Sequence, residues 1–263
     1  MIEIAKPHAP QLRKSFHLLY HQLCAVPTEY LYAVSKNQFE AQLDCMTALG
    51  TQANCLVPQI TFDDGYMSDY EYALPALQAR EMQATFFITA GWTGRMAGYM
   101  DWAEIRAIHA AGQQIGAHGW SHKLLTHCDD STLHDELTRS KAVLEDKLGT
   151  AVDSMSLPGG RSNRRVMQAC WNAGYAHVYT SEPRAEPIPA GAVIGRMNIR
   201  ADMKLEWIAS LFQQHSPARA AVIRRYKQKQ MAKSILGDTL YEKLWNVLNR
   251  KDQEVSHSES IPK

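Results

Sequence analysis

The stretch "TFDDG", residues 61–65, ends a β-branched and aromatic run with two adjacent carboxylates and a glycine. The preceding run "PQITF" predicts a strand, and the glycine predicts a turn at its carboxyl end. If the strand belongs to a parallel barrel, Asp63 and Asp64 lie at the mouth where such barrels carry their chemistry. The alternative is an ordinary pair of solvated turn aspartates, because Asp beside Gly is common in turns.

Short β-rich runs alternate with helical patterns along the chain. Repeated β-α units imply parallel strands, and 263 residues with 45% hydrophobic content can bury one sizeable core. We therefore favour an α/β barrel of the TIM type over an open doubly wound sheet. The expected strands are "FHLLYHQL", "PQITF", "ATFFITA", "QIGAH", "SMSLP", "AHVYT" and "AVIGRMNI", and the expected helices are "SDYEYALPALQARE", "DWAEIRAIHAAG", "DDSTLHDELTRSKAVLEDKLG" and "NRRVMQACWNAG".

The overall charge is balanced, with 28 Lys and Arg against 27 Asp and Glu, so nothing calls for a nucleic-acid partner. The amino terminus lacks the pattern of an export signal, and no run of about 18 apolar residues occurs. Five widely spaced cysteines fit reduced thiols better than a disulfide framework. These features predict a cytoplasmic protein.

A second group of chemically active residues lies in "HGWSHKLLTHC". His118 closes the run "QIGAH", and His122 follows four residues later, where "SHKLL" is expected to begin a helix. Two imidazoles at this spacing can reach one ion, and imidazole with carboxylate suits Zn²⁺ or a similar divalent metal. Alone, the histidine pair equally fits surface or core positions. The aspartates that end an earlier strand strengthen the prediction of a metal site.

Taken together, "TFDDGY", "ATFFITAGW", "IGAHGWSHKLL" and "ELTRSKAVLEDKLG" resemble the polysaccharide deacetylase family, the NodB homology domain. The resemblance implies an irregular, seven-stranded (β/α) barrel. It also implies that Asp64, His118 and His122 are ligands of a divalent metal, with Zn²⁺ as the expected ion, and that Asp63 is the catalytic base. The implied activity is removal of N-acetyl groups from a sugar in a glycan or lipid-linked glycan precursor.

Two carboxylates suit this chemistry because amide hydrolysis needs two roles filled. Asp64, bound to the metal, stays ionised, whereas the unligated Asp63 is free to accept a proton from the attacking water. The metal would acidify that water and polarise the acetyl carbonyl.

The sequence departs from the family pattern at "SLPGGRSN", where many members have Arg-x-Pro. Ser156 stands at the arginine position, while Pro158 and Gly159 are kept, so a backbone N–H near Gly159 is expected to face the oxyanion. Arg161 is a candidate to orient Asp63 in place of the missing arginine. The alternative is that Arg161 is a solvated residue before a helix.

The late-strand motif Leu-x-His of the family is also absent from "AVIGRMNIR". His21 and His127 are expected to be structural or surface residues, so protonated Asp63 is the candidate to return its proton to the leaving amine. Two other functions remain open: hydrolysis of small cyclic amides on the same scaffold, and a carbohydrate-binding module with impaired catalysis.

We expect a catalytic barrel over residues 1–203, a basic helical extension over 204–250 and a disordered tail over 251–263. Nine Lys and Arg lie between Pro217 and Lys251, against two acids. They suggest peripheral contact with the cytoplasmic face of a membrane. The alternative is a helix hairpin packed on the barrel with a solvated basic face. The apolar face of the extension consists of Leu240, Tyr241, Leu244 and Leu248.

Overall fold

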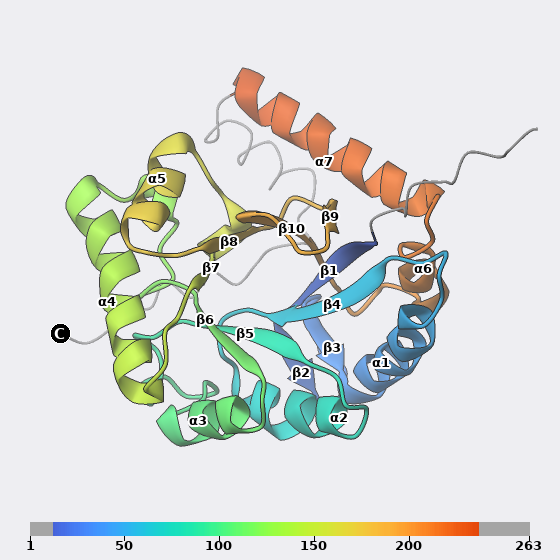
Figure 1. Cartoon of the computed structure of the whole chain (residues 1–263), viewed down its shortest axis with the longest axis horizontal. Helices are drawn as coiled ribbons and strands as arrows, with labels where there is room; N and C mark the ends of the chain where they lie inside the picture. The colour runs from blue at the N-terminus through green and yellow to red at the C-terminus, as the bar shows by residue number, and fades with distance from the viewer. Residues whose placement is uncertain (1–12, 237–263) are drawn as a thin grey trace, which may run out of the picture.

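The computed structural model describes residues 13–236, with side chains through residue 232. Seven parallel strands form a closed barrel, because β1 pairs with β4 on one side and with β10 on the other. The helices lie around the outside of this barrel (Figure 1). All seven expected strands are present, which confirms the predicted barrel. They are β1 (Lys14–Tyr20), β4 (Val57–Phe62), β5 (Ala84–Ile88), β6 (Gln114–Ala117), β7 (Ser154–Ser156), β8 (His177–Thr180) and β10 (Val193–Asn198).

The barrel is irregular, as the family resemblance implied. Strands β6 and β7 pair at a single position, Ala117 with Met155, whereas β1 and β4 pair over six. Three short strands add to the seven. The predicted run "FHLLYHQL" reaches into the first of them, and the other two were not expected from the sequence. Strands β2 (Gln22–Cys24) and β3 (Ala33–Ser35) pair with each other after β1, and β9 (Ala185–Pro187) runs antiparallel to β1.

The four helices predicted between the barrel strands are present, with one departure: the segment after residue 68 begins as a π-helix. Capping explains several boundaries. Asp101 starts α3 with a capping box to Glu104, and Gly149 ends α4 with a φ of 70°. The helices are α1 (Lys36–Gly50), the π-helix η1 (Asp69–Ala73), α2 (Leu74–Gln78), α3 (Trp102–Ala110), the 3₁₀ turn η2 (Leu125–His127), α4 (Asp130–Leu148), the 3₁₀ turn η3 (Pro158–Gly160), α5 (Arg164–Asn172), α6 (Leu205–Ser210) and α7 (Pro217–Leu236).

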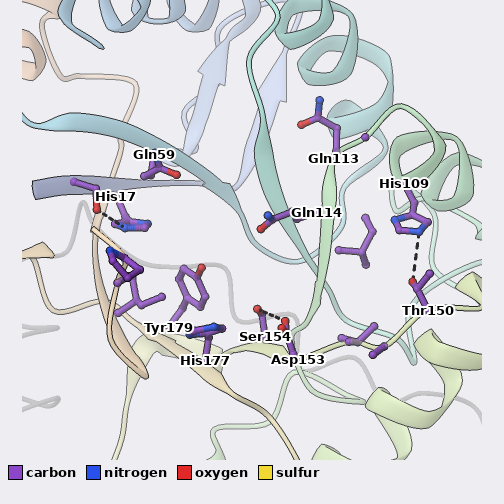
Figure 2. Close-up of a pocket in the computed structure, with 18 of the residues that line it drawn as sticks. His17, Gln59, His109, Gln113, Gln114, Thr150, Asp153, Ser154, His177 and Tyr179 are labelled. Carbon is purple, nitrogen blue, oxygen red and sulfur yellow. Dashed lines mark hydrogen bonds between the residues drawn. The ribbon is translucent and has the colours of Figure 1, made fainter. Parts of the chain in front are cut away.

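The barrel interior is layered. The Arg196 side chain is fully buried, and its guanidinium carbon lies 5.2 Å from the ring centre of Phe87 and 5.7 Å from that of Tyr179. These two rings are 4.8 Å apart. On the far side of Tyr179, the ring of His17 lies 6.0 Å away, in the half of the barrel that the strands enter first (Figure 2). An aromatic layer therefore separates the two ends of the barrel.

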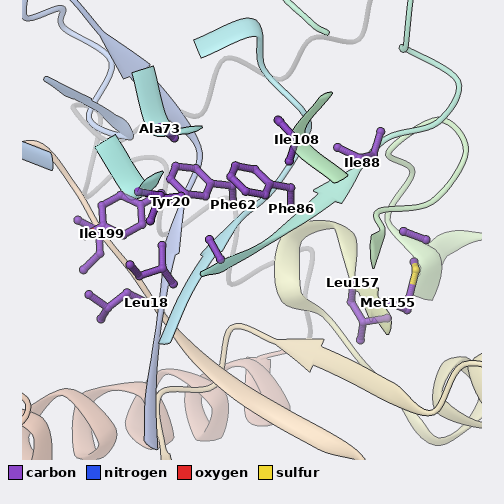
Figure 3. Packing of buried hydrophobic residues seen from close by; sticks show 14 of the residues in the cluster. Leu18, Tyr20, Phe62, Ala73, Phe86, Ile88, Ile108, Met155, Leu157 and Ile199 are labelled. Atoms are coloured by element: carbon purple, nitrogen blue, oxygen red, sulfur yellow. The ribbon is translucent and has the colours of Figure 1, made fainter. Parts of the chain in front are cut away.

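Outside the barrel wall, aromatic rings pack against the covering helices (Figure 3). The rings of Tyr20, Phe62 and Phe86 stack in a row, with centroid distances of 5.4 and 4.9 Å, and Phe39 of α1 meets Tyr20 edge-on at 5.1 Å. All four side chains are fully buried. Burial of each stabilises the fold by about 1.5–3 kcal/mol. This row fixes β1, β4 and β5 side by side, and with them the strand end that carries the two aspartates.

The carboxyl-terminal part of the described chain consists of α6 and α7. The predicted break at "HSP" is confirmed, because Ser216 caps α7 by accepting from the backbone N–H of Arg219. None of the helices in residues 13–236 has the length and apolar character that crossing a bilayer requires. Within the same range, which holds all five cysteines, every cysteine is a free thiol. The break at "LGD", the apolar face at residues 240–248 and the tail at 251–263 lie outside the described residues.

Candidate active site

Asp63 and Asp64 follow β4 at the mouth of the barrel and are 3% and 7% exposed, so they are not solvated turn residues. The backbone N–H of Asp63 extends the sheet by donating to the carbonyl of Tyr20. At Asp64 the chain turns sharply, with a φ of 79°, and Gly65 follows with a φ of 87°. A left-handed conformation is uncommon for a residue other than glycine and is typical of functional sites. It allows both carboxylates to face the same space.

His118 and His122 meet Asp64 at this mouth. The Nε2 atom of each imidazole lies 3.3 Å from Oδ1 of Asp64, and one ligand atom from each of the three residues lies within 4.8 Å of the others. The expected helix at "SHKLL" is wrong. His122 has a φ of 60° and belongs to a loop, and only the 3₁₀ turn η2 follows. The left-handed backbone turns the His122 ring back towards His118, where a helix would have carried it away.

The hydrogen bonding of this cluster suits a divalent metal. The Nδ1–H of His118 donates to the backbone carbonyl of Ser156 at 2.9 Å, so the lone pair of Nε2 faces Asp64. Oδ1 of Asp64 is buried and accepts no hydrogen bond from the described residues. Burial alone would raise the pKa of the Asp64 carboxyl, but His118 and His122 hold it well below its usual range. Two imidazole nitrogens and one ionised carboxylate form a donor set that Zn²⁺ favours.

A buried glutamate on α4 holds the loop that carries His122. Glu136 is 2% exposed, and its carboxylate accepts from the backbone N–H groups of Trp120 and Ser121 at 2.9 and 2.8 Å and from the Ser121 hydroxyl. Gly119 has a φ of 75°, and a Cβ there would lie 3.1 Å from the Glu136 carboxylate. Glu136 was not identified from the sequence. Its only signal was an acidic residue on the apolar face of the helix.

Asp63 is held by a different set of partners. The guanidinium of Arg196 donates to both of its oxygens, at 2.7 and 2.9 Å, and the Ser156 hydroxyl donates to Oδ2 at 2.9 Å. Arg196 also donates to the Ser156 oxygen at 2.6 Å, to Thr61 at 3.2 Å and to the carbonyl of Thr180 at 3.3 Å. Burial would raise the pKa of Asp63, but the charges of Arg196 and His118 lower it below its usual range. The carboxylate is therefore ionised and fixed in orientation.

This arrangement agrees with the comparison with known proteins. Residues 52–178 match the sequence model of the family described as polysaccharide deacetylase. Over this segment the chain is similar to the polysaccharide deacetylase family. It is 26% identical to the Bacillus subtilis protein YxkH, classed by name with these deacetylases, over 184 residues that cover 64% of each chain. It is 29% identical to a chitin deacetylase from Pestalotiopsis sp over 124 residues, which cover 46% of this chain and 41% of that protein. The chain thus spans less than two thirds of the length of both relatives.

Solved structures of polysaccharide deacetylases have the same fold. The Streptococcus pyogenes deacetylase PplD, determined in complex with acetate, aligns with a TM-score of 0.66 at 22% identity, over 74% of this chain and 96% of that chain. A polysaccharide deacetylase from Bacillus cereus aligns with a TM-score of 0.66 at 21% identity, over 76% of this chain and 69% of that chain. At these identities the likeness establishes the barrel and nothing beyond it.

Within the polysaccharide deacetylase family pattern, the structure accounts for the serine at position 156. A small side chain there leaves room for the guanidinium of Arg196, which enters from β10 and contacts both Asp63 and Ser156. Arg196 was not identified from the sequence, although an arginine inside the apolar run "AVIGRMNI" was a signal. Arg161 follows η3, with Pro158 buried and Gly159 exposed at a φ of 64°. The orienting role of Arg161 and the oxyanion role of Gly159 remain predictions.

Aromatic side chains lie beside the cluster of Asp64, His118 and His122. The ring of Trp92 lies 5.1 Å from that of His122 and 4.8 Å from that of Tyr99, which stacks on Tyr66 at 4.7 Å. His21 follows β1 at the same mouth. Burial lowers the pKa of His21, although the nearby negative charges of Asp64 and Asp63 act in the opposite direction.

Proposed function

We propose that this protein is a metal-dependent hydrolase that removes N-acetyl groups from sugars of a glycan or glycan precursor. The observation that carries the proposal is that two adjacent carboxylates have different sets of partners. Asp64 shares one cluster with His118 and His122, while Asp63 is fixed beside it by Arg196. Similarity to the polysaccharide deacetylase family supports the same reaction.

Asp64, His118 and His122 are the residues that would hold the metal. When bound, a divalent ion such as Zn²⁺ supplies an acidified water and polarises the amide carbonyl. His118 donates its Nδ1–H to Ser156 and so keeps Nε2 available as a ligand atom. Glu136 keeps the His122 loop in place, and its role is to preserve the spacing of the three ligands.

Asp63 moves the proton in this proposal. Its Oδ2 lies 3.8 Å from Nε2 of His118, which places it next to the metal ligands without joining them. It takes the proton of the attacking water as the new C–O bond forms. It then gives that proton to the nitrogen as the C–N bond breaks, so that acetate and a free amino sugar leave. We further propose that the Gly159 N–H faces the oxyanion and that Arg161 adds positive charge near the site.

The substrate class follows from the site's surroundings. Tyr66 follows the two aspartates in the chain, is partly exposed and stacks on Tyr99. Aromatic faces stack well on the CH faces of sugar rings. We propose an N-acetylated sugar within an oligosaccharide as the substrate.

Acetate release from a panel of N-acetylated oligosaccharides tests the function. The enzyme should release acetate when loaded with Zn²⁺ and lose this activity after chelation, and Asp63→Asn should be nearly inactive. A hydrolase of small cyclic amides would instead open ring amides and release no acetate. A carbohydrate-binding module would bind the oligosaccharides and leave them intact.

We also propose cytoplasmic location with peripheral membrane contact through α7. Its surface carries Arg224 and Lys227 beside the apolar Ile223 and Met231, a combination that suits an anionic bilayer surface. Arg219, one of the nine basic residues, is buried and donates to three backbone carbonyls, so it is not available for this contact.

Sedimentation with anionic liposomes tests the membrane contact. Binding should be stronger at low salt, and Arg224→Glu with Lys227→Glu should weaken it. Lys147→Glu, an exposed charge on α4, serves as the control. Equal sedimentation of all three proteins would exclude a membrane role for α7.

A further inference from the structure

A cavity of about 800 Å³ lies at the opposite end of the barrel from Asp63. Residues in the early parts of six of the seven barrel strands line it, including His17 in β1, Gln59 in β4, Gln114 in β6, Ser154 in β7, His177 in β8 and Ile194 in β10. Because the amino ends of parallel strands share one mouth, this cavity and the active site occupy the two ends of one barrel. Figure 2 shows the cavity.

The floor of the cavity is the aromatic layer of the barrel. Phe87, Tyr179 and Ile194 form a small buried cluster that is separate from the main core. Arg196 and its contacts to Asp63 lie on the other side of this layer. Barrels of this type are usually filled by side chains along their whole axis. Here the filling stops at Tyr179, and polar side chains line the open space beyond it.

Several polar groups face this space. In Figure 2 the side chains of Gln114, Tyr179 and Ser154 approach its centre from different strands. The Nδ1 atoms of His177 and His109 are buried and have no hydrogen-bond partner among the described residues. The same two histidines line the cavity, so its wall combines amide, hydroxyl and imidazole groups.

The charge of the lining restricts the occupant. Among the residues that the structure describes, no lysine or arginine lines the cavity, and Asp153 supplies the one carboxylate. Burial, together with the nearby Arg196, lowers the pKa of His17 to about 4, so this ring is neutral at pH 7. An anion would therefore meet neither a lysine nor an arginine among these residues. The rim also offers apolar contact through Ile188 and Pro189. A neutral ligand with many hydroxyl groups and apolar CH faces fits both features.

We infer that the cavity is a second binding site, which takes a short neutral saccharide at the end of the barrel remote from catalysis. Its volume suits a ligand of more than one sugar ring. The amides of Gln59 and Gln114, the Tyr179 hydroxyl and the His177 ring supply donors and acceptors for the hydroxyl groups. This site does not depend on the proposed deacetylation.

Methyl NMR of the metal-loaded, full-length protein with chitotriose tests the inference, because isoleucines report on both ends of the barrel. Ile188 and Ile194 line the cavity, whereas Ile88 contacts Gly65 at the active site. Chitotriose should shift the methyl signals of Ile188 and Ile194 in a saturable way, whether or not the Ile88 signal also shifts. Inorganic phosphate at the same concentration should leave these two signals unchanged.

A double variant, Gln59→Leu with Gln114→Leu, should weaken the response of Ile188 and Ile194 at least about tenfold, because two hydrogen-bonding amides are lost. An unchanged Ile88 signal and thermal unfolding temperature would show that the variant is folded. Gln78→Leu, an exposed amide at the end of α2, is the matched control and should leave the affinity unchanged. The inference is overturned if chitotriose shifts Ile88 alone or neither end, if phosphate alone shifts Ile188 and Ile194, or if the double variant binds as tightly as the wild type.

Discussion

Arg196 holds both carboxylate oxygens of Asp63 across the width of β1, because β4 and β10 are the two neighbours of that strand. The pair is almost completely buried, with side-chain exposures of 0% and 4%. A bidentate guanidinium fixes both the charge and the orientation of a carboxylate. Arg196 is thus the residue through which the last barrel strand controls the proposed base.

Replacing Arg196 by Met should reduce kcat/KM for deacetylation by about 10² or more, the scale of a displaced general base. Loss of the positive charge would also let burial raise the pKa of Asp63, so the acidic limb of the pH profile should move to higher pH. The isolated buried charge should lower the free energy of unfolding by about 3–5 kcal/mol. Steady-state kinetics across pH and urea unfolding provide the measurements.

The matched control is Arg200→Met, which removes a partly exposed arginine paired with Asp202. This change should alter stability by less than about 1 kcal/mol and leave the pH profile in place. Arg196→Lys keeps the positive charge but cannot make the two parallel hydrogen bonds to Asp63. Its acidic limb should therefore lie near the wild-type position, while its kcat stays below the wild-type value. If Arg196→Met kept the wild-type profile, Asp63 would not depend on this pair.

For Asp63→Asn we expect nearly unchanged metal content and a turnover lower by about 10² or more, because the amide cannot accept the proton. Elemental analysis and acetate release on the same preparation separate the two effects. Arg161→Ala should cause a smaller loss. Wild-type turnover in a metal-loaded Asp63→Asn enzyme would assign the base to another residue, and wild-type activity of Arg161→Ala would favour its interpretation as a solvated residue.

His118→Ala should remove most of the bound metal, because it deletes a buried ligand atom 3.3 Å from Asp64. Elemental analysis after dialysis measures the loss. His109→Ala, a histidine at the opposite end of the barrel, is the control and should keep the wild-type metal content. Equal metal in all three proteins would rule out this ligand assignment.

The sequence predicted the barrel well because each strand is a short apolar run bounded by turn residues, and the predicted runs coincide with β1, β4 to β8 and β10. The grouping of Asp64, His118 and His122 also follows from strand ends that share one mouth. Arg196 and Glu136 could not be assigned in this way. Each acts on residues far away in the chain, and their contacts depend on how β10 and α4 pack, which no local pattern encodes.

Glu136→Ala should weaken metal binding about 10- to 100-fold, the usual effect of removing a residue that supports a ligand. The carboxylate holds the N–H groups of Trp120 and Ser121, and without it the loop can move His122 away from Asp64. Competition with a chromophoric chelator measures the affinity. Asp146→Ala, an exposed acid on the same helix, should leave it unchanged. Equal affinities in both variants would show that the loop holds its shape without Glu136.

His17 should make the protein less stable as the pH falls from about 6.5 to about 4. Burial, with the nearby Arg196, lowers its pKa to about 4, whereas the unfolded chain should titrate near 6.5. In this pH window the unfolded state binds a proton that the native state does not. The contribution of the neutral His17 to the free energy of unfolding is therefore complete above about pH 6.5 and is lost as the pH falls. A shift of this size corresponds to roughly 3 kcal/mol.

His17→Gln removes the titration and can keep a hydrogen bond to Ser15. Urea unfolding at about pH 7 and about pH 4.5 should show that His17→Gln loses roughly 2–3 kcal/mol less stability than the wild type, while the exposed control His134→Gln loses as much as the wild type. Equal losses in all three proteins would mean that His17 is protonated in the folded state over this range.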